Sequence, residues 1–315
     1  MRLGGRTRRA WKRKDGMNKM QHQPAATQAT TELEFGDSHG HLCSERADEW
    51  ADVFAANMKA QRVRKATLSG VGLFTPDQDE LVLRAYERHP ERFIPFLCQI
   101  DPDDTASTCY IDQQLPRAPW GGVGEVFLNT SGLVYAQPLL LPDGTSRPFR
   151  YPVPKDGAAC KVFRFMFDKC AEVGKPVWVH CEHAMPLWTM LKRHPRTPVL
   201  WAHADYVTPP EDVRHLLDAF PNLTCDFGPG LRIVQGQLAA EEKLPSVLRR
   251  MAEWKGIMRD YPDRLTLGTD IIKWQSMAAY AKTYELYSSL LHDLPPDSGR
   301  KIAYGNFRRL VERQP

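Results

Sequence analysis

The sequence predicts an α/β fold of the (β/α)8 class, a TIM barrel. Eight short apolar runs alternate with helical segments, which is the pattern of a parallel sheet covered by helices. They extend over nearly all of the chain after residue 33, close to the about 250 residues typical of such barrels. The first run leads into His39-Gly40-His41 rather than into a glycine-rich phosphate turn, which disfavours a doubly wound sheet.

The predicted strands are short and apolar, and several are preceded by proline or glycine. Leu33 to Phe35 opens the series and runs into Asp37. The other strands cover residues 66–70, 93–97, 122–128, 176–180, 199–203, 223–227 and 265–270.

The predicted helices carry apolar residues at helical spacing. In the first, residues 48–58, these are Trp50, Phe54 and Met58, and the second, residues 77–89, ends before Pro90. A weak helix at 106–115 follows, then helices at 157–173, 186–193, 210–220, 244–259, 277–291 and 297–311.

The net charge of +4 comes from the N-terminal segment. Residues 1–20 hold eight basic residues and one acidic residue, which leaves 34 basic and 37 acidic residues in the rest. We interpret residues 1–33 as a disordered basic extension and residues 34–315 as one barrel domain. A faintly acidic body is not typical of a nucleic-acid-binding fold, so no nucleic-acid partner is expected.

Composition also indicates where in the cell the protein acts and which partners it binds. No apolar run is long enough to cross a membrane, and no membrane partner is expected. Seven cysteines without a Cys-x-x-Cys pair indicate reduced thiols and a cytoplasmic protein. The expected partner is a small-molecule substrate. Because exposed barrel helices often pair, a homo-oligomer is also compatible with the sequence.

Polar residues occur where the predicted strands end. The C-terminal ends of barrel strands meet at one mouth, where active sites form. His39 and His41 are two residues apart, so both side chains can face the barrel axis. Imidazoles and carboxylates are ligands for a divalent ion, zinc first, with manganese or iron as alternatives. The candidate metal ligands are His39, His41, Glu125, His180, His203 and Asp270.

Each of these residues also has a structural explanation. A single histidine at a strand end is more often hydrogen-bonded than metal-bound, and Asp270 could cap the helix that follows. Together, several imidazoles and two carboxylates at the ends of five apolar strands would be costly to bury without a cation. The set therefore favours a metal centre.

The ordered motifs resemble the amidohydrolase superfamily over roughly residues 35–310. They are Asp-Ser-His-Gly-His, Gly-Glu in the fourth strand, the histidines of Pro-Val-Trp-Val-His and Trp-Ala-His-Ala, and Leu-Gly-Thr-Asp. The ending Gly305-Asn306-Phe307-Arg308-Arg309-Leu310 resembles the amidohydrolase-related (amidohydrolase 2) branch.

The resemblance implies roles for individual residues. It makes His39, His41, His180 and Asp270 metal ligands. His203 corresponds to a histidine that is catalytic in one-metal members and a ligand in two-metal members. A glutamate at the position of Glu125 bridges two ions in two-metal members, so one or two ions per chain are expected.

We expect a metal-dependent hydrolase that uses metal-activated water on a small carbonyl substrate, a lactone, amide or ester. Asp270 would shuttle the proton and His203 would stabilise the oxyanion. The alternatives are a non-oxidative decarboxylase of aromatic or heterocyclic acids and a nuclease of the TatD type.

Substrate contacts are expected outside the strands. Residues 129–155 form a long, proline-rich, lid-like loop with Arg147 and Arg150. Arg232 follows the seventh strand and His183 follows the fifth. These four residues are the candidate substrate-binding groups.

Overall fold

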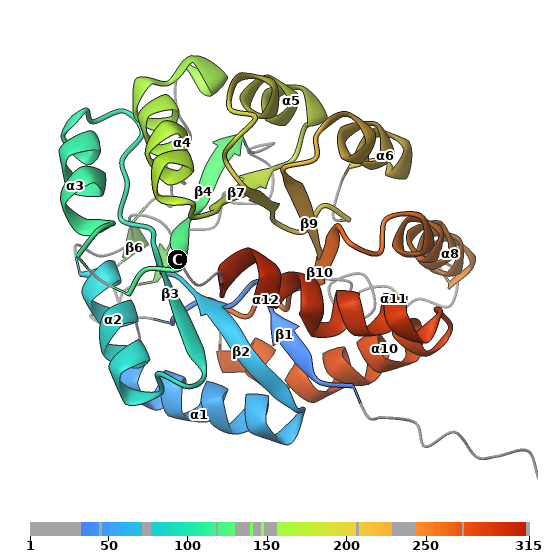
Figure 1. The fold of residues 1–315 in the computed structure, drawn as a ribbon. Helices are drawn as coiled ribbons and strands as arrows, with labels where there is room; N and C mark the ends of the chain where they lie inside the picture. Colours follow the sequence, from blue (N-terminus) through green and yellow to red (C-terminus); the bar gives the residue numbers. More distant parts are fainter. Residues whose placement is uncertain are drawn as a thin grey trace, which may run out of the picture. The chain divides into compact units, whose positions relative to one another are not determined.

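Eight parallel strands form the predicted barrel in a computed structural model (Figure 1). Their order around the barrel follows the chain, so each strand pairs with the next strand of the barrel. The barrel strands are β1 (Phe35–Asp37), β2 (Val63–Leu68), β3 (Phe93–Leu97), β4 (Gly122–Asn129), β7 (Val177–Cys181), β8 (Val199–Trp201), β9 (Leu223–Phe227) and β10 (Leu265–Leu267). The TIM-barrel prediction is confirmed.

The structure describes residues 33–43, 46–70, 77–117, 119–129, 139–140, 146–147, 156–205, 208–228, 244–272 and 274–312. Nearly all of the predicted extension 1–33 and most of the loop 129–155 lie outside these residues. Within the loop, the structure describes two antiparallel strands of two residues each, β5 (Leu139–Leu140) and β6 (Ser146–Arg147), which form a hairpin.

The two edges of the sheet meet between β1 and β10. Ser38 N–H donates to the Leu267 carbonyl at 2.8 Å, and the Ser38 and Thr266 hydroxyls are 2.9 Å apart. Further along, Asp270 N–H donates to the His39 carbonyl at 2.8 Å. These bonds nearly close the barrel and bring the first and last predicted ligands to the same seam.

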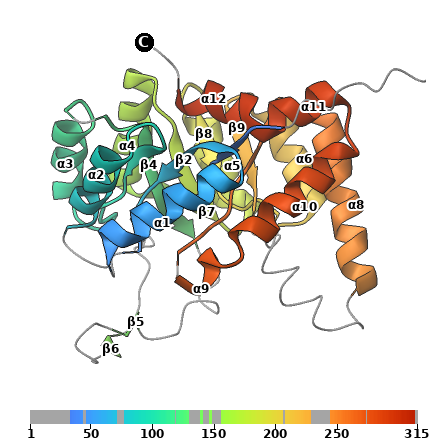
Figure 2. The same cartoon turned by 90° about the horizontal axis from the view of Figure 1, so that it is seen from below.

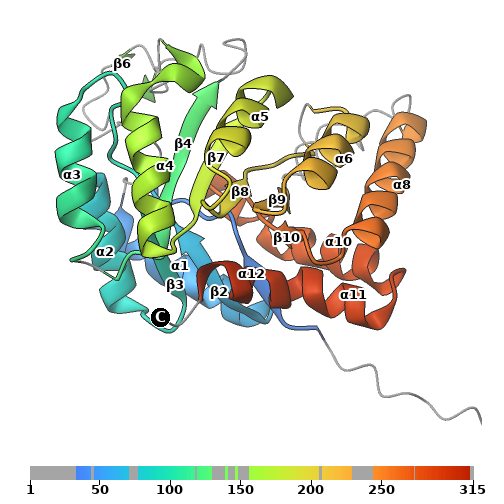
Figure 3. The same cartoon turned by 45° about the horizontal axis from the view of Figure 1, so that its top comes forward.

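Helices surround the strands (Figures 1 and 3). In α1, the side chains of Trp50, Phe54 and Met58 are fully buried, which follows from their spacing of four residues along one face. The described helices are α1 (Ala47–Ala60), α2 (Gln78–Arg88), α3 (Ala106–Gln114), α4 (Lys161–Val173), α5 (Ala184–Arg193), α6 (Pro210–Ala219), α8 (Leu244–Asp260), α9 (Trp274–Met277), α10 (Tyr280–His292), α11 (Pro296–Arg300) and α12 (Asn306–Val311), with a 3-10 turn at Gly157–Ala159 and a π turn at Lys301–Gly305.

The last two predicted helices differ from the observed ones. The predicted helix 277–291 is α10, which begins three residues later, at Tyr280, because Met277 ends the separate short helix α9. The predicted helix 297–311 contains the π turn between α11 and α12. Periodicity did not locate this π turn, because Ile302, Ala303 and Phe307 are all buried and keep apolar spacing through it.

Strands β8 and β10 end earlier than predicted. His203 and Asp270, which were expected to end these strands, have φ angles of +35° and +49°. Such left-handed backbone is incompatible with an extended strand. Each residue therefore lies in the turn that follows its strand.

The barrel interior holds a small apolar core distinct from the layer between strands and helices. The N-terminal end of the barrel is closed by α12, which crosses it (Figure 1), while α9 and the β5–β6 hairpin lie at the opposite end (Figure 2). The interior core consists of Ile94, Phe96, Trp178, Leu200, Ala202, Phe307 and Leu310.

Two expectations from composition concern the cysteines and the membrane. All seven cysteines are free thiols in the structure. Within the described part of the chain, no helix combines the length and apolar character needed to cross a membrane.

Asn306, the asparagine of the C-terminal motif, fastens α12 to the barrel. Its buried side-chain amide donates to the carbonyls of Pro262 and Leu265, both at 2.7 Å. Asn306→Ala leaves both acceptors without this donor, so we expect a loss of about 2–4 kcal/mol in the free energy of unfolding, measured by urea denaturation. The exposed neighbour Arg308→Ala is the control and should change it by less than about 0.5 kcal/mol. Equal stability of the two variants would contradict this role.

Candidate metal centre

The six predicted ligands meet at the C-terminal mouth of the barrel and come from five of its strands. His39 and His41 follow β1, Glu125 and His180 lie within β4 and β7, and the remaining two follow strands as left-handed residues. Five of the six are buried, and the Asp270 side chain is 12% exposed.

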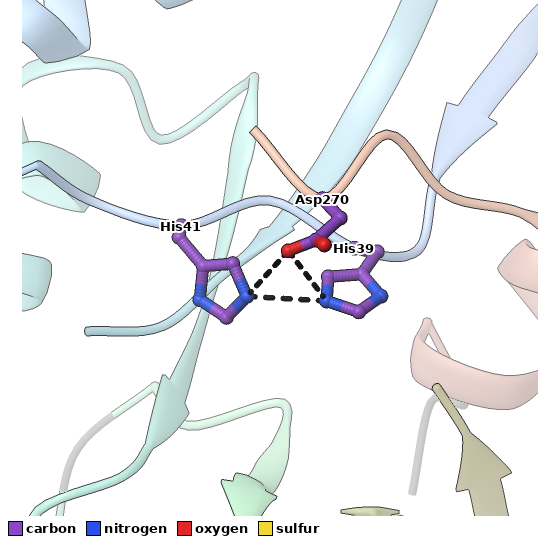
Figure 4. A group of neighbouring side chains, drawn as sticks. All are labelled: His39, His41 and Asp270. Carbon is purple, nitrogen blue, oxygen red and sulfur yellow. Dashed lines mark hydrogen bonds and ion pairs between the residues drawn. The ribbon is translucent and has the colours of Figure 1, made fainter. Parts of the chain in front are cut away.

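The tightest group consists of His39, His41 and Asp270 (Figure 4). The two Nε2 atoms are 3.1 Å apart, and Asp270 Oδ1 lies 3.4 Å from His39 Nε2 and 3.6 Å from His41 Nε2. Ligand atoms about 2.0–2.2 Å from an ion lie about 2.8–3.6 Å from one another in tetrahedral or octahedral coordination. The triangle therefore has the dimensions of a coordination face.

Glu125 lies between this group and two further histidines. Its Oε2 is 3.3 Å from His41 Nε2 and 3.7 Å from His39 Nε2. Its Oε1 is 3.4 Å from His180 Nδ1 and 3.5 Å from His203 Nε2. Although Oε1 is buried, it makes no hydrogen bond of ordinary geometry within the described residues. One carboxylate thus presents an oxygen to each of two sets of imidazole nitrogens.

His39, Glu125 and His203 form a second close group, so His39 belongs to both groups. One nitrogen binds one ion, and His39 Nδ1 is already occupied by Asp226 at 2.9 Å. His39 can therefore serve only one ion at a time. His180 joins the cluster through Glu125 and is in neither close group of the described residues.

The outer nitrogens of His39, His180 and His41 each lie near an acceptor. Asp226 Oδ2 faces His39 Nδ1, and Glu182 Oε1 lies 3.3 Å from His180 Nε2. The outer nitrogen of His41 is 3.2 Å from the Gly70 carbonyl and 3.1 Å from the Ser69 hydroxyl. Such partners fix the tautomer of a metal-binding histidine, leaving the inner nitrogen free to bind. This arrangement and the donor set fit a divalent ion.

The charges in the cluster perturb one another strongly. Burial alone would lower the pKa of His39, but the carboxylates of Asp226 and Glu125 raise it well above its ordinary value. Burial alone would raise the pKa of Glu125, but the facing imidazoles, His39 first, lower it well below its ordinary value. Burial lowers the pKa of His203, and the neighbouring His180 lowers it further. The carboxylates thus hold negative charge that cations must balance.

An irregularity in β4 turns Glu125 inward. The pairing of β4 with β7 shifts register between Val123 and Val126, and both valines pack in the outer core. Gly124 has a φ of +140°, and a Cβ there would lie 2.3 Å from the Trp178 carbonyl. Only glycine fits this position, which places Glu125 on the inner side.

Trp178 forms the floor of the cluster. Its ring stacks under that of His41 at a centroid distance of 5.3 Å and meets that of His39 edge-on at 4.7 Å. It also belongs to the apolar core inside the barrel. The indole therefore separates the polar mouth from the apolar interior.

Asp37 ties the two segments of the seam together. Its Oδ1 accepts the N–H groups of His39 at 3.2 Å and Thr269 at 3.0 Å, and its Oδ2 accepts the Thr269 hydroxyl at 2.7 Å. Tyr280 donates to Oδ2 at 3.2 Å. Burial raises the pKa of Asp37 to about 6 despite these bonds. The carboxyl group thus fixes the backbone at the candidate ligand His39 and next to the candidate ligand Asp270.

The predicted substrate contacts are mostly not described. Arg150 and Arg232 lie outside the described residues, and only the backbone of Arg147 is described, in β6. His183 is exposed and directly precedes α5. Their roles stay predictions.

Sequence analysis missed Asp226 and Ser69. Asp226 is fully buried in β9, one of two polar residues in an otherwise apolar strand. A carboxylate in such a strand, near its C-terminal end, was the available signal. Ser69 directly follows β2 and carried no comparable signal.

Comparison with known proteins identifies the family. The family model described as Amidohydrolase matches residues 37–313, nearly the whole barrel. The chain therefore belongs to the amidohydrolase family, as its motifs indicated. Members of this family are enzymes, hydrolases or decarboxylases. No curated protein matches the chain.

Solved structures confirm the fold at low sequence identity. A probable 2-pyrone-4,6-dicarboxylic acid hydrolase from Acinetobacter baumannii has a TM-score of 0.59 at 14% identity, over 89% of this chain and 100% of its own. The 5-carboxyvanillate decarboxylase of Sphingomonas paucimobilis has a TM-score of 0.55 at 13% identity, over 90% and 100%. A manganese complex of this decarboxylase from Novosphingobium aromaticivorans has a TM-score of 0.53 at 11% identity, over 89% and 96%.

If these residues form a metal centre, binding of a divalent ion should stabilise the folded protein. Zn²⁺ or Mn²⁺ at 100 times its dissociation constant should stabilise the chelator-treated protein by about 2.7 kcal/mol, measured as a rise in Tm. His41→Ala should abolish most of this rise because it removes a ligand. The control His215→Ala changes an exposed imidazole on α6 and should keep the full rise. A rise that survives in His41→Ala would argue against the centre.

Proposed function

We propose that the protein is a metal-dependent hydrolase of a small carbonyl substrate, a lactone, amide or ester. The observation that carries this proposal is the placement of Asp270. Its Oδ1 lies within 3.6 Å of both His39 Nε2 and His41 Nε2, and its side chain is the most exposed of the ligand set. A partly exposed carboxylate beside a bound ion could exchange protons with an attacking water.

The donor set would hold one or two divalent ions. We favour two, with Glu125 as the bridge, because its two oxygens face different groups of nitrogens. His39, His41 and Asp270 would hold one ion, and His180 and His203 the other. With one ion, Glu125 and His203 would instead act on the substrate.

Zinc is the first candidate, with manganese and iron as alternatives, because all three accept imidazole and carboxylate ligands. Manganese is bound in the Novosphingobium aromaticivorans decarboxylase structure. When bound, the ion supplies Lewis acidity, which polarises a carbonyl oxygen and makes water more acidic.

The chain's own groups would then act in order. Asp270 takes a proton from the attacking water and passes it to the leaving oxygen or nitrogen as the carbonyl–heteroatom bond breaks. In a one-metal centre, His203 stabilises the negative charge that develops on the carbonyl oxygen. The indole of Trp178 shields the floor from water.

The substrate is proposed to be a small cyclic or aromatic acid derivative. The solved structures named above include a probable 2-pyrone-4,6-dicarboxylic acid hydrolase and a 5-carboxyvanillate decarboxylase, so carboxylated rings are the compounds to test first. Arg147, Arg150, Arg232 and His183 remain candidates for binding the carboxylate.

Decarboxylation is the second candidate function, because two of the structures named above are decarboxylases. A metal-replete screen against lactones, amides and aromatic acids separates the two reactions. Ring-opened or cleaved product without CO₂ supports hydrolysis. Released CO₂ with an otherwise intact ring supports the decarboxylase. Single-stranded DNA serves as the substrate of the nuclease alternative, and its cleavage would overturn both.

Asp270→Asn removes the proton acceptor while keeping the shape of the side chain. We expect kcat to fall by about 10²–10⁴-fold on the substrate found in the screen. Metal content is measured in parallel, so that the loss is compared at equal occupancy. Undiminished kcat in a fully loaded Asp270→Asn variant would exclude the shuttle.

Glu125→Gln tests the bridge. An amide is a weaker ligand and cannot bridge two cations as a carboxylate does. We expect the bound metal to fall from two ions per chain to one, measured by elemental analysis after dialysis. Two ions retained in Glu125→Gln would contradict bridging, and one ion in the wild type would favour the mononuclear centre.

A further inference from the structure

The carboxylate of Asp226 faces two different parts of the centre. Its Oδ2 lies 2.9 Å from His39 Nδ1, and its Oδ1 accepts the backbone N–H of His203. The Asp226 side chain is fully buried in β9, whereas His39 follows β1 and His203 follows β8. Asp226 therefore links residues from three strands.

The contact with His39 defines which nitrogen carries the proton. A carboxylate can only accept a hydrogen bond, so the proton must be on Nδ1. In the neutral ring, Nε2 then has a free lone pair. That atom faces His41 and Asp270. Asp226 thus selects the tautomer of His39 that can bind an ion.

The contact with His203 holds a strained turn. His203 has a φ of +35°, which few residues other than glycine adopt. Two bonds from Asp226 support the turn, since the carboxylate accepts the His203 N–H and the backbone carbonyl accepts the Ala204 N–H at 3.2 Å. The turn directs the His203 ring toward Glu125 Oε1.

The surroundings are shaped for this carboxylate. A Cβ on Gly268 would lie 2.4 Å from His39 Cβ and 3.1 Å from Asp226 Oδ2. A side chain there would separate the pair. The glycine that follows β10 thus leaves room for the Asp226–His39 contact.

We propose that Asp226 is a positioning residue that sets the tautomer of His39 and the backbone of His203 together, preparing both for metal. This inference rests on the metal centre of the proposed function. Asp226 acts through its partners, because both of its oxygens are engaged by them.

Asp226→Asn is an informative substitution because both partners donate hydrogen bonds. If the new amide nitrogen faces His203, two donors meet. If it faces His39, Nδ1 must accept, and the proton moves to Nε2, where it blocks the ion. Neither orientation preserves the wild-type arrangement, although the side chains have nearly the same size.

The experiment titrates chelator-treated wild-type and Asp226→Asn proteins with Zn²⁺ and Co²⁺. We expect the dissociation constant of the variant to rise about 10–100-fold and the visible absorption of bound Co²⁺ to change. Cys225→Ala alters the same strand within the outer core and is the control. It should keep the wild-type affinity and spectrum, and urea denaturation without metal reports any loss of fold.

The outcomes separate the two proposals. A wild-type protein that binds no metal overturns the proposed function and this inference with it. A metal-binding wild type with an unaffected Asp226→Asn variant overturns this inference alone. If the variant does not fold, nitrogen NMR of Zn²⁺-loaded wild-type protein with labelled histidine replaces it. The proton of His39, assigned with His39→Gln, should be on Nδ1, and its absence there overturns the inference.

Discussion

The burial of opposite charges at one end of the barrel is the constraint on which the rest of the structure depends. Glu125 is withdrawn from water among four imidazoles, and Asp270 closes the group at its more exposed side. Such a set is stable only when each charge is balanced and each polar atom has a partner. Protons on the histidines can supply this balance, and so can a divalent ion that displaces them.

Local features of several strands and of α12 position these charged side chains and keep them together. The irregular step in β4 turns Glu125 inward, and Trp178 closes the floor against the apolar core. Asp37 joins the seam between β1 and β10, while α12 closes the opposite end of the barrel. These features place flexible polar side chains on rigid elements, which is how a catalytic site keeps its geometry.

Membership of the amidohydrolase family accounts for the barrel and the ligand motifs, but it does not determine the reaction. The hydrolase and decarboxylase structures share this fold at 11–14% identity. Function resides in the groups at the mouth rather than in the fold. We therefore propose that the choice between hydrolysis and decarboxylation depends on substrate contacts in the loops after the strands, where the candidates Arg147, Arg150 and Arg232 lie in the sequence.

The sequence by itself determined the order of strands and helices and the candidate ligand residues at the strand ends, because periodicity and strand-end position are local properties. β3 and β9 have the predicted bounds. Only the tertiary structure decided which atoms meet. The left-handed turns at His203 and Asp270, the inward step at Glu125 and the role of Asp226 each depend on a partner distant in sequence. Such contacts arise only when the barrel closes, so no sequence window could contain them.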